Sequence, residues 1–374
     1  MTQKSGPWTR RQFNQALAVS AAAALFDRRS FAATGPSSAG FAYVAAGSED
    51  GSIHVLQVAD SRWTPVQTLS AAAPSHLELH PHLPLIYVVH AVGIWNGLPR
   101  GAVSAYDIHP ATGHVTLRVT QPLSLSAIYP RHAAISPHGR HLLVAAEHGG
   151  IYNLLPLDLY GTPGAPTAIR KEHGIGEAED VKTSRPAHVV FDSLGTNVFT
   201  ADVGHETISS FTCERDSMRL EDRARSHAGA GPSQLIHSSA GGCVYALNAD
   251  NGSIAVHRLE GLQISSASQV LPSRNPGPAH MALHPNGRFM VRAGGGVLTT
   301  LAIAREDGSL TTASVMPLKQ YQSNVAFTPD GNHLISMSEE EISQIPFDAA
   351  AGVLGVPQIV ARVPAARSVL FRSA

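Results

Sequence analysis

A histidine two residues after a proline recurs along the chain, each time at the start of an apolar run. The copies read Pro74-Ser75-His76, Pro130-Arg131-His132, Pro186-Ala187-His188 and Pro278-Ala279-His280. Imidazole titrates near neutral pH and can act as a general base, bind an anion or ligate a metal. Four such side chains at equivalent positions therefore predict a site, with the guanidinium of Arg131 beside them.

The histidines belong to a longer repeat, which must position them. After the tripeptide each copy has an apolar strand, a turn and a second apolar strand, as in AAISPHGRHLLVAA after His132. Other copies place Gln234, Asn324 or Ala366 where the histidine stands. Successive copies begin at residues 74, 130, 186, 232, 278 and 322, so their spacings are 56, 56, 46, 46 and 44 residues. A seventh copy begins at Pro364 and is cut short by the end of the chain.

The missing half of the seventh copy lies at the other end of the chain. Residues 41–46 (FAYVAA) match the second strand of the repeat, and residues 53–58 (IHVLQV) follow as a third. Four short strands per repeat and hairpin turns such as Asp250-Asn251-Gly252 are typical of β-propeller blades. We predict an all-β, seven-bladed β-propeller whose ring is closed by strands from both termini. A pair of β-sandwiches is the alternative, but it explains neither the repeat nor the split copy.

Length and composition agree with a single ring. The 374 residues would allow two or three domains at about 100–200 residues each. Without residues 1–33, however, seven blades share 341 residues, about 49 each, which matches the repeat spacing. Charged residues make up 15% of the chain, against roughly 25% in an average domain, and it holds 33 Gly and 25 Pro. This composition argues against disorder and coiled coils and favours short strands with tight turns.

Residues 1–33 are predicted to be a twin-arginine signal peptide, and residues 34–374 the propeller. Thr9-Arg10-Arg11-Gln12-Phe13 is a twin-arginine pattern, and Ser30-Phe31-Ala32 offers a cleavage site between small residues. The apolar run between them, residues 16–26, is too short to span a bilayer, which needs about 20 residues. We therefore expect the twin-arginine export machinery to be a partner and the mature protein to be periplasmic.

The mature chain lacks the features of two other classes of protein. Residues 1–33 hold five basic residues and one acidic residue, so the net charge of −1 becomes −5 without them. With no basic stripe left, we expect no nucleic-acid binding. No second apolar stretch approaches membrane length, so we expect no membrane span.

Cys213 and Cys243 could pair in an oxidising compartment or stay free, and the sequence leaves both states open.

The propeller fold gathers the polar side chains on one face. The first strand of each blade lines the channel, and the loop entering it opens on the same face as the loop leaving the second strand. We therefore expect His76, His132, His188 and His280 to ring one channel mouth. The second strands end there with His90, Glu147, His148, Asp202, His205, Asn248 and Glu339. The alternative is structural, because a repeated histidine can also hydrogen-bond the backbone of the neighbouring blade.

Sequence motifs of several enzyme classes are missing. The chain has no G-x-S-x-G elbow, no G-x-x-x-x-G-K-[ST] loop and no H-E-x-x-H pair. We therefore predict no α/β-type serine hydrolase, no cofactor and no metal site. His80, His109 and His284 each precede a proline and are expected to be turn or surface residues.

The chain resembles the seven-bladed lactonase family over residues 41–374. The resemblance rests on Ser136-Pro137-His138-Gly139-Arg140 with LLVAA, on the Glu147-His148-Gly149-Gly150 turn with LLPLDLYGT, and on Ala201-Asp202-Val203-Gly204. That family includes bacterial 6-phosphogluconolactonases and fungal carboxymuconate cyclases. The resemblance implies a channel mouth that binds a small anionic or polyhydroxylated lactone. Hydrolysis there would need a base-activated water and donors for the carbonyl oxyanion.

The match to the family is partial at the level of single residues. Pro130-Arg131-His132 matches the family's strand entry, and Asp202 and Asn248 match polar positions. The chain departs from the family pattern in blades five and six, at Ser233-Gln234, Ala249, His280, Ala282 and Gly294–Gly296. There the family often has Arg-His, a Glu, a Glu, a His and an Arg, respectively.

Functions of different classes remain open at this point. For a hydrolase acting on a sugar lactone, unphosphorylated if the protein is exported, we predict His132 or His188 as the base. Arg131 would hold a carboxylate or phosphate. The predicted substrate contacts are His76, His90, Glu147, Asp202, Asn248 and His280. The alternatives are a non-catalytic binding or scaffolding propeller and a cyclase or isomerase of a muconate-like organic acid.

Overall fold

The computed structural model describes residues 40–372 apart from 48–49, 60–61, 172–182, 215, 227–229, 239–240, 274–277 and 319. The chain divides into two units, residues 1–38 and 39–374, and all described residues belong to the second. The predicted signal peptide therefore lies outside the described residues and stays a prediction. Among the described residues there are strands, turns and connections, and no helix that could cross a membrane.

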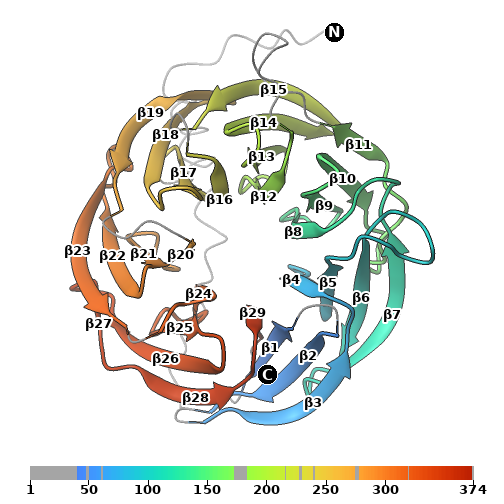
Figure 1. The fold of residues 1–374 in the computed structure, drawn as a ribbon, viewed down its shortest axis with the longest axis horizontal. Helices are drawn as coiled ribbons and strands as arrows, with labels where there is room; N and C mark the ends of the chain where they lie inside the picture. Colours follow the sequence, from blue (N-terminus) through green and yellow to red (C-terminus); the bar gives the residue numbers. More distant parts are fainter. Residues whose placement is uncertain are drawn as a thin grey trace, which may run out of the picture. The chain divides into compact units, whose positions relative to one another are not determined.

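Seven antiparallel sheets, the blades, follow one another around the centre of a ring (Figure 1). Blade 1 is β29 (Ala366–Arg372), β1 (Phe41–Ala46), β2 (Ser52–Gln57) and β3 (Thr64–Ser70). Blade 2 is β4 (Pro74–Leu79), β5 (Leu85–His90), β6 (Ala102–Ile108) and β7 (Val115–Pro122). Blade 3 is β8 (Pro130–Ile135), β9 (His141–Ala146), β10 (Ile151–Pro156) and β11 (Ala168–Lys171).

The remaining blades keep the same order from the centre outward. Blade 4 is β12 (Pro186–Phe191), β13 (Asn197–Asp202), β14 (Thr207–Glu214) and β15 (Ser217–Arg225). Blade 5 is β16 (Pro232–Ser238), β17 (Cys243–Asn248), β18 (Ile254–Glu260) and β19 (Gln263–Leu271). Blade 6 is β20 (Ala279–Leu283), β21 (Phe289–Gly294), β22 (Val297–Ile303) and β23 (Leu310–Pro317). Blade 7 is β24 (Asn324–Phe327), β25 (His333–Met337) and β26 (Glu341–Asp348), with β27 (Val353–Leu354) and β28 (Gln358–Arg362) both pairing with β26.

The ring closes through blade 1, which combines both ends of the described chain. β29 pairs antiparallel with β1, with Val369 opposite Val44 and Arg372 opposite Phe41. The innermost strands contact one another in a full circle, β4, β8, β12, β16, β20, β24, β29 and back to β4. The predicted seven-bladed propeller and its closure are therefore confirmed. Closure leaves no open sheet edge between the first and last blades, which protects against edge-to-edge aggregation.

The second strand of each blade is buried on both faces, because each blade packs against a neighbour on either side. In β1, β5, β17 and β21 all six residues are buried. Strands covered on both sides need continuous apolar runs instead of alternation, and runs such as FAYVAA supply them. A tyrosine in three of these strands donates its hydroxyl to a glycine carbonyl in the next blade, the pairs being Tyr43–Gly113, Tyr87–Gly161 and Tyr245–Gly308.

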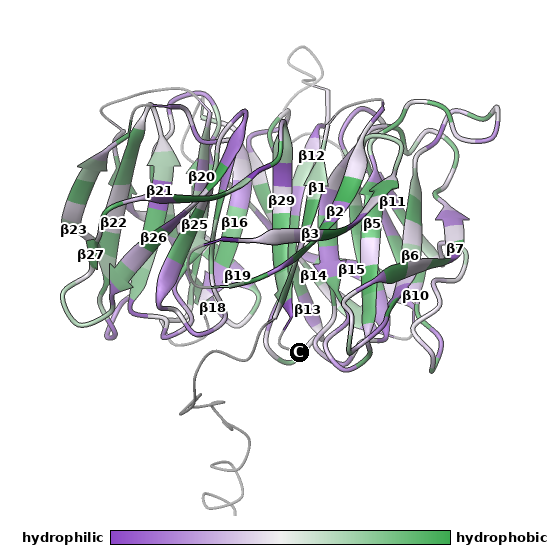
Figure 2. Ribbon diagram, turned by 90° about the horizontal axis from the view of Figure 1, so that it is seen from below, coloured by the Kyte–Doolittle hydropathy of each residue, from purple (hydrophilic) through white to green (hydrophobic). Residues whose placement is uncertain are grey.

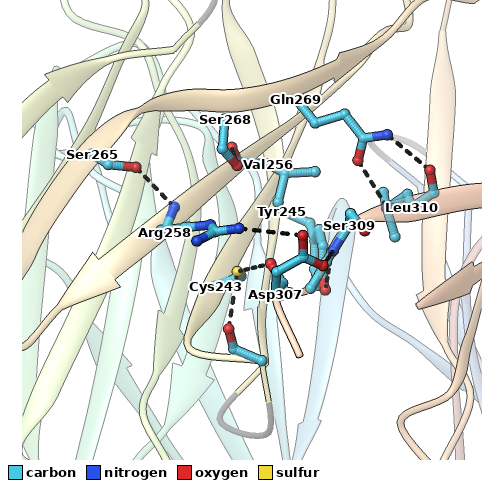
Figure 3. A network of polar contacts seen from close by, with 12 residues as sticks. Cys243, Tyr245, Val256, Arg258, Ser265, Ser268, Gln269, Asp307, Ser309 and Leu310 are labelled. Carbon is cyan, nitrogen blue, oxygen red and sulfur yellow. Dashed lines mark hydrogen bonds and ion pairs between the residues drawn. The ribbon is translucent and has the colours of Figure 1, made fainter. Parts of the chain in front are cut away.

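Polar contacts join blades 5 and 6 at their outer strands, as Figure 3 shows. The Arg258 guanidinium lies 3.2 Å from the Asp307 carboxylate. The Gln269 amide bonds both backbone groups of Leu310 at 2.8 Å. Cys243 donates its thiol to a backbone carbonyl in this network. Cys213 and Cys243 are both free and buried, so of the two states left open by the sequence the structure has the free thiols.

The His-Pro turns also join blades, at the end of the ring where the innermost strands finish. His80 is buried, and its Nε2 lies 3.2 Å from the carbonyl of Gly139 in the next blade. His284 is buried in the same way, 2.9 Å from the carbonyl of Gly331. His80 and His284 are thus turn residues that connect blades rather than surface residues, while His109 lies in an exposed turn. In Figure 2, β29 runs down to this end.

Candidate functional site

Three of the four Pro-x-His tripeptides, those that end in His76, His132 and His188, form β-bulges at the end of the ring where the innermost strands begin, here called the mouth. In β8, Pro130 pairs with Ala146 and His132 with Ala145, so Arg131 has no partner in the ladder. The same shift occurs in β4, β12 and β16. Proline is tolerated at the first residue of a strand, and a bulge re-aims the unpaired side chain. This local geometry directs Arg131 into the mouth.

The seventh copy shows the same bulge in a different register from the one the sequence indicated. Ala366 pairs with Ala46 and Ser368 with Ala45, so Arg367 is the unpaired residue and Ser368 takes the position of the histidine. We expected Ala366 there, and that alignment was wrong by two residues. The sequence therefore missed Arg367, whose equivalence to Arg131 becomes visible once Ala366 is aligned with Pro130.

A cavity of about 720 Å³ occupies the mouth. It is lined by the bulges of several blades, and five of the nine predicted site residues are among them: His76, Arg131, His132, His188 and His280. Gln234, Asn324, Glu339 and Arg367 also line it. Residues from inner strands more than 200 positions apart in the chain thus share one cavity.

Three of the histidines form a stack on one side of the cavity. The ring centroids of His76 and His132 are 4.1 Å apart, and those of His132 and His188 are 3.6 Å apart. The Nδ1 atoms of His132 and His188 are buried, and neither has a hydrogen-bond partner among the described residues. Because an unpaired buried polar atom costs free energy, these nitrogens are suited to meet a ligand.

Burial and the neighbouring charges keep the imidazoles of His132, His188 and His280 neutral. Burial, then His76 and Arg131, lowers the pKa of His188 to about 3. Burial, then His188, His76 and Arg131, holds the pKa of His132 well below its ordinary value. Burial, then Arg131, lowers the pKa of His280 to about 4. The charge of Arg131 therefore acts on three histidines from different blades, and at neutral pH each offers one N–H donor and one nitrogen acceptor.

His76 differs from the other two rings of the stack because it has a carboxylate partner. Its Nε2 lies 3.4 Å from Oε2 of Glu78, and the other oxygen of Glu78 accepts a hydrogen bond of 3.3 Å from the backbone N–H of Ile135. The Nδ1 of His76 makes no hydrogen bond to the described residues. Sequence reasoning missed Glu78, although its spacing of two residues from His76 along β4 places both side chains on one face of the strand.

Glu147 lies at the rim of the mouth between two arginines. Its carboxylate is 3.2 Å from Arg131 and 2.5 Å from Arg185. Burial works to raise the pKa of Glu147, but the two arginines outweigh it, so the pKa lies below its ordinary value. Glu147 does not line the cavity directly. It holds Arg131, which does.

The structure does not bring His90, Asp202 and Asn248 to the cavity. All three are the last residue of a second strand, and they are only 2%, 2% and 0% exposed. His90 bonds the Ala72 carbonyl and Ser104, Asp202 accepts from Ser184 and the Arg185 backbone, and Asn248 bonds Ser226 and Ser253. At this shared position the side chain holds the loop that enters its own blade, so these residues lie at the mouth end of their strands but do not line the cavity.

Two ring positions follow the structural alternative that the sequence left open. The Gln234 amide accepts from the backbone N–H of Met281 at 2.7 Å and donates to its carbonyl at 2.8 Å. The Asn324 amide donates to the carbonyl of Arg367 at 2.8 Å. These amides join neighbouring inner strands. No group of three or more side chains able to hold a metal occurs within the described ranges.

Comparison with known proteins gives the family. The model of the family "Lactonase, 7-bladed beta-propeller" matches residues 41–371. No curated protein matches the sequence. Similar solved structures include the Pseudomonas aeruginosa periplasmic gluconolactonase PpgL, with 20% identity, a TM-score of 0.78, and 90% of this chain and 99% of that chain covered. A candidate 6-phosphogluconolactonase from Bacteroides fragilis has 18% identity, a TM-score of 0.78, and coverage of 90% and 98%. At these identities the neighbours show the fold, and the family model shows that the chain belongs to the seven-bladed β-propeller lactonase family.

Proposed function

We propose that this protein hydrolyses an unphosphorylated sugar lactone in the mouth cavity. The observation that carries the proposal is the stack of His76, His132 and His188, with open ring nitrogens beside Arg131 in a cavity of about 720 Å³. Membership of the lactonase family supports it. The neighbours from Pseudomonas and Bacteroides are named for sugar lactones, the first without a phosphate and the second with one.

In this proposal His76 is the general base. With its Nε2 toward Glu78, its Nδ1 is left to take a proton from a water molecule as the water attacks the lactone carbonyl carbon. The Glu78 carboxylate stabilises the imidazolium that forms. When the ring carbon–oxygen bond breaks, the imidazolium returns the proton to the departing alkoxide, and a hydroxy acid is released. Protons balance, and no further reactant is needed.

His132 and His188 act as binding groups in this scheme. Sequence reasoning assigned the role of base to one of them, and that assignment stays a prediction. A base is most efficient when its pKa lies near the working pH, and the pKa of His188 is about 3. Neutral rings that keep an unpaired nitrogen suit hydrogen bonds to sugar hydroxyls or to the carbonyl oxygen. Arg131 supplies positive charge where the oxyanion develops.

The charges of the mouth support a substrate without a phosphate. Of the two arginines in the cavity, Arg131 shares the carboxylate of Glu147 with Arg185, and Glu339 lines the same cavity as Arg367. The two carboxylates offset part of the positive charge that a phosphate dianion would need. An uncharged polyhydroxylated ring fits the open donors and acceptors better. Export by the twin-arginine route, as the leader predicts, would also place the protein among unphosphorylated lactones.

The test is acid release from glucono-δ-lactone and from 6-phosphogluconolactone. We expect acceleration over the spontaneous rate, with the higher kcat/KM for glucono-δ-lactone. Arg131→Gln should lower kcat/KM, whereas Arg140→Gln, an exposed arginine in the turn at the other end of β8, should not. No acceleration with either lactone would overturn the proposal and leave the non-catalytic alternative.

A further inference from the structure

Large apolar side chains are exposed beside the mouth, on loops that the proposed mechanism does not use. Loop 91–101 joins β5 to β6, and segment 123–129 joins β7 to β8, so both lie at the mouth end of the ring. Ile94, Leu98, Leu125 and Tyr129 are 69%, 42%, 59% and 44% exposed. We call these four side chains the rim platform.

The two loops form one body. The backbone N–H of Tyr129 donates to Val92, that of Ser126 to Pro99, and that of Gly101 to Ala127, at 2.8–3.0 Å. An antiparallel bridge between Trp95 and Leu98 gives loop 91–101 its own small hairpin. The platform is therefore held in place by its backbone, although its side chains are exposed.

Backbone strain is concentrated in the same loops. Asn96, Ser126 and Tyr129 have φ angles of 50°, 68° and 50°, and they are three of the seven non-glycine residues with positive φ among those described. A positive φ is uncommon for any L-residue and is an outlier for a bulky one such as Tyr129. Strain of this kind persists where the surroundings enforce it, and it clusters at ligand sites.

The platform adjoins the wall of the proposed catalytic cavity through Tyr129, which lies two residues before the cavity residue Arg131. The backbone N–H of Glu147 donates to the Tyr129 carbonyl, and the carboxylate of Glu147 holds Arg131 at the cavity wall. The Tyr129 ring packs on His148, with ring centroids 4.7 Å apart. A Cβ on Gly149 would lie 1.8 Å from the Ser126 carbonyl oxygen, so this turn contacts segment 123–129 directly. A ligand in the cavity is thus within one or two residues of an apolar surface.

We propose that the rim platform binds an alkyl or aryl substituent of the lactone, so that the substrate class combines a lactone ring with an apolar group. The inference rests on the proposed lactonase function. The platform loops carry a single charged residue, the half-buried Arg100, so the exposed surface that the four platform side chains offer is apolar. Apolar area removed from water is the interaction that it can supply.

The test compares δ-dodecalactone with δ-valerolactone, which share a lactone ring and differ by a heptyl chain. Burial of roughly two methylene groups would favour the alkylated lactone about tenfold in kcat/KM. The double variant Ile94→Ser/Leu98→Ser should bring this ratio close to one. Leu159→Ser is the matched control, because Leu159 is 87% exposed at the other end of the ring, and it should leave the ratio unchanged.

Binding of the corresponding δ-lactams, with and without the heptyl chain, separates this inference from the proposed function because it needs no catalysis. Tighter binding of the heptyl lactam by calorimetry, lost in the double variant, would support the platform even if no lactone were hydrolysed. Equal binding of both lactams would overturn the inference while leaving lactone hydrolysis standing. A change of oligomeric state in the double variant, with an unchanged substrate ratio, would assign the platform to a second copy of the chain and also overturn it.

Discussion

The ring of equivalent positions at the mouth has three adjacent imidazoles, here called the imidazole half, and two amides on either side of His280, here called the amide half. In blades 2, 3 and 4 the position holds His76, His132 and His188, whose rings stack on one another. In blades 5 and 7 it holds Gln234 and Asn324, whose amides bond the backbone of the next inner strand. One position in a repeat can therefore join two blades or line a site, depending on the side chain.

The difference follows from the geometry of the two groups. A primary amide carries a donor and an acceptor side by side, so Gln234 can bond both the N–H and the carbonyl of Met281. An imidazole has its two nitrogens on separate edges of the ring and cannot make that pair. Stacked rings instead leave a ring nitrogen without a protein partner among the described residues. The imidazoles therefore supply less stability than the amides do, but they can bind a ligand. The predictions below test this division of roles.

The largest expected effect is on catalysis in the imidazole half. Glu78→Gln removes the charge that stabilises the His76 imidazolium, so kcat on glucono-δ-lactone should fall by about 10²-fold or more while KM changes little. Glu78→Asp should restore part of kcat. Glu260→Gln, which changes an exposed carboxylate at the end of β18, serves as the control. Steady-state kinetics measure these values, and an unaltered kcat in Glu78→Gln would remove His76 from the role of base.

Acid stability should also separate the two halves. The pKa of His188 is about 3 in the folded protein and 6.5 ordinarily, so the unfolded chain binds more protons between these values. The stabilisation from neutral His188 is therefore complete above pH 6.5 and is lost as pH falls toward 3. Relative to His188→Gln, the wild type should lose up to about 2 kcal/mol of unfolding free energy between pH 6.5 and 4.5. Urea titrations at both pH values measure the free energy of unfolding. Equal losses in the wild type and in His188→Gln would contradict the prediction.

Leucine substitutions compare the two halves at constant pH. Gln234→Leu leaves both backbone groups of Met281 without their partner, which should cost about 1–2 kcal/mol. His188→Leu removes a ring nitrogen that is buried without a partner among the described residues, so its cost should be close to zero or negative. The free energy of unfolding at pH 7 is the measurement. Equal losses in the two variants would show that His188 is as structural as Gln234.

The fold was predictable from the sequence because propeller packing repeats. Every second strand is sandwiched between neighbouring blades and needs an apolar run, and every hairpin needs a turn residue, so the pattern recurs visibly. The split of blade 1 between the two ends of the chain followed from the same count. The repeat also placed His76, His132, His188 and His280 in one cavity, as expected from equivalent positions.

The rest of the site depends on side-chain direction, which residue type does not give. His90, Asp202 and Asn248 end strands at the mouth, but their neighbours in the entering loops use up their polar atoms. Arg367 was missed because the seventh copy was aligned on Pro364, whereas the register makes Ala366 the equivalent of Pro130. The repeat predicts which strand a residue joins, but the register decides where its side chain points.

The corrected register of β29 leads to the prediction with the smallest expected effect, at the seventh ring position. Ser368 Oγ accepts a hydrogen bond of 3.3 Å from the backbone N–H of Leu77, so Ser368 belongs with the amides that join blades. The bond is long and the group small, so Ser368→Ala should cost only about 0.5–1 kcal/mol of unfolding free energy. The exposed Ser266→Ala is the control and should cost less. An unchanged free energy of unfolding in Ser368→Ala would contradict this prediction. The contact between blades 1 and 2 would then depend on backbone packing alone, and the side chain at position 368 would not join blades as the amides do.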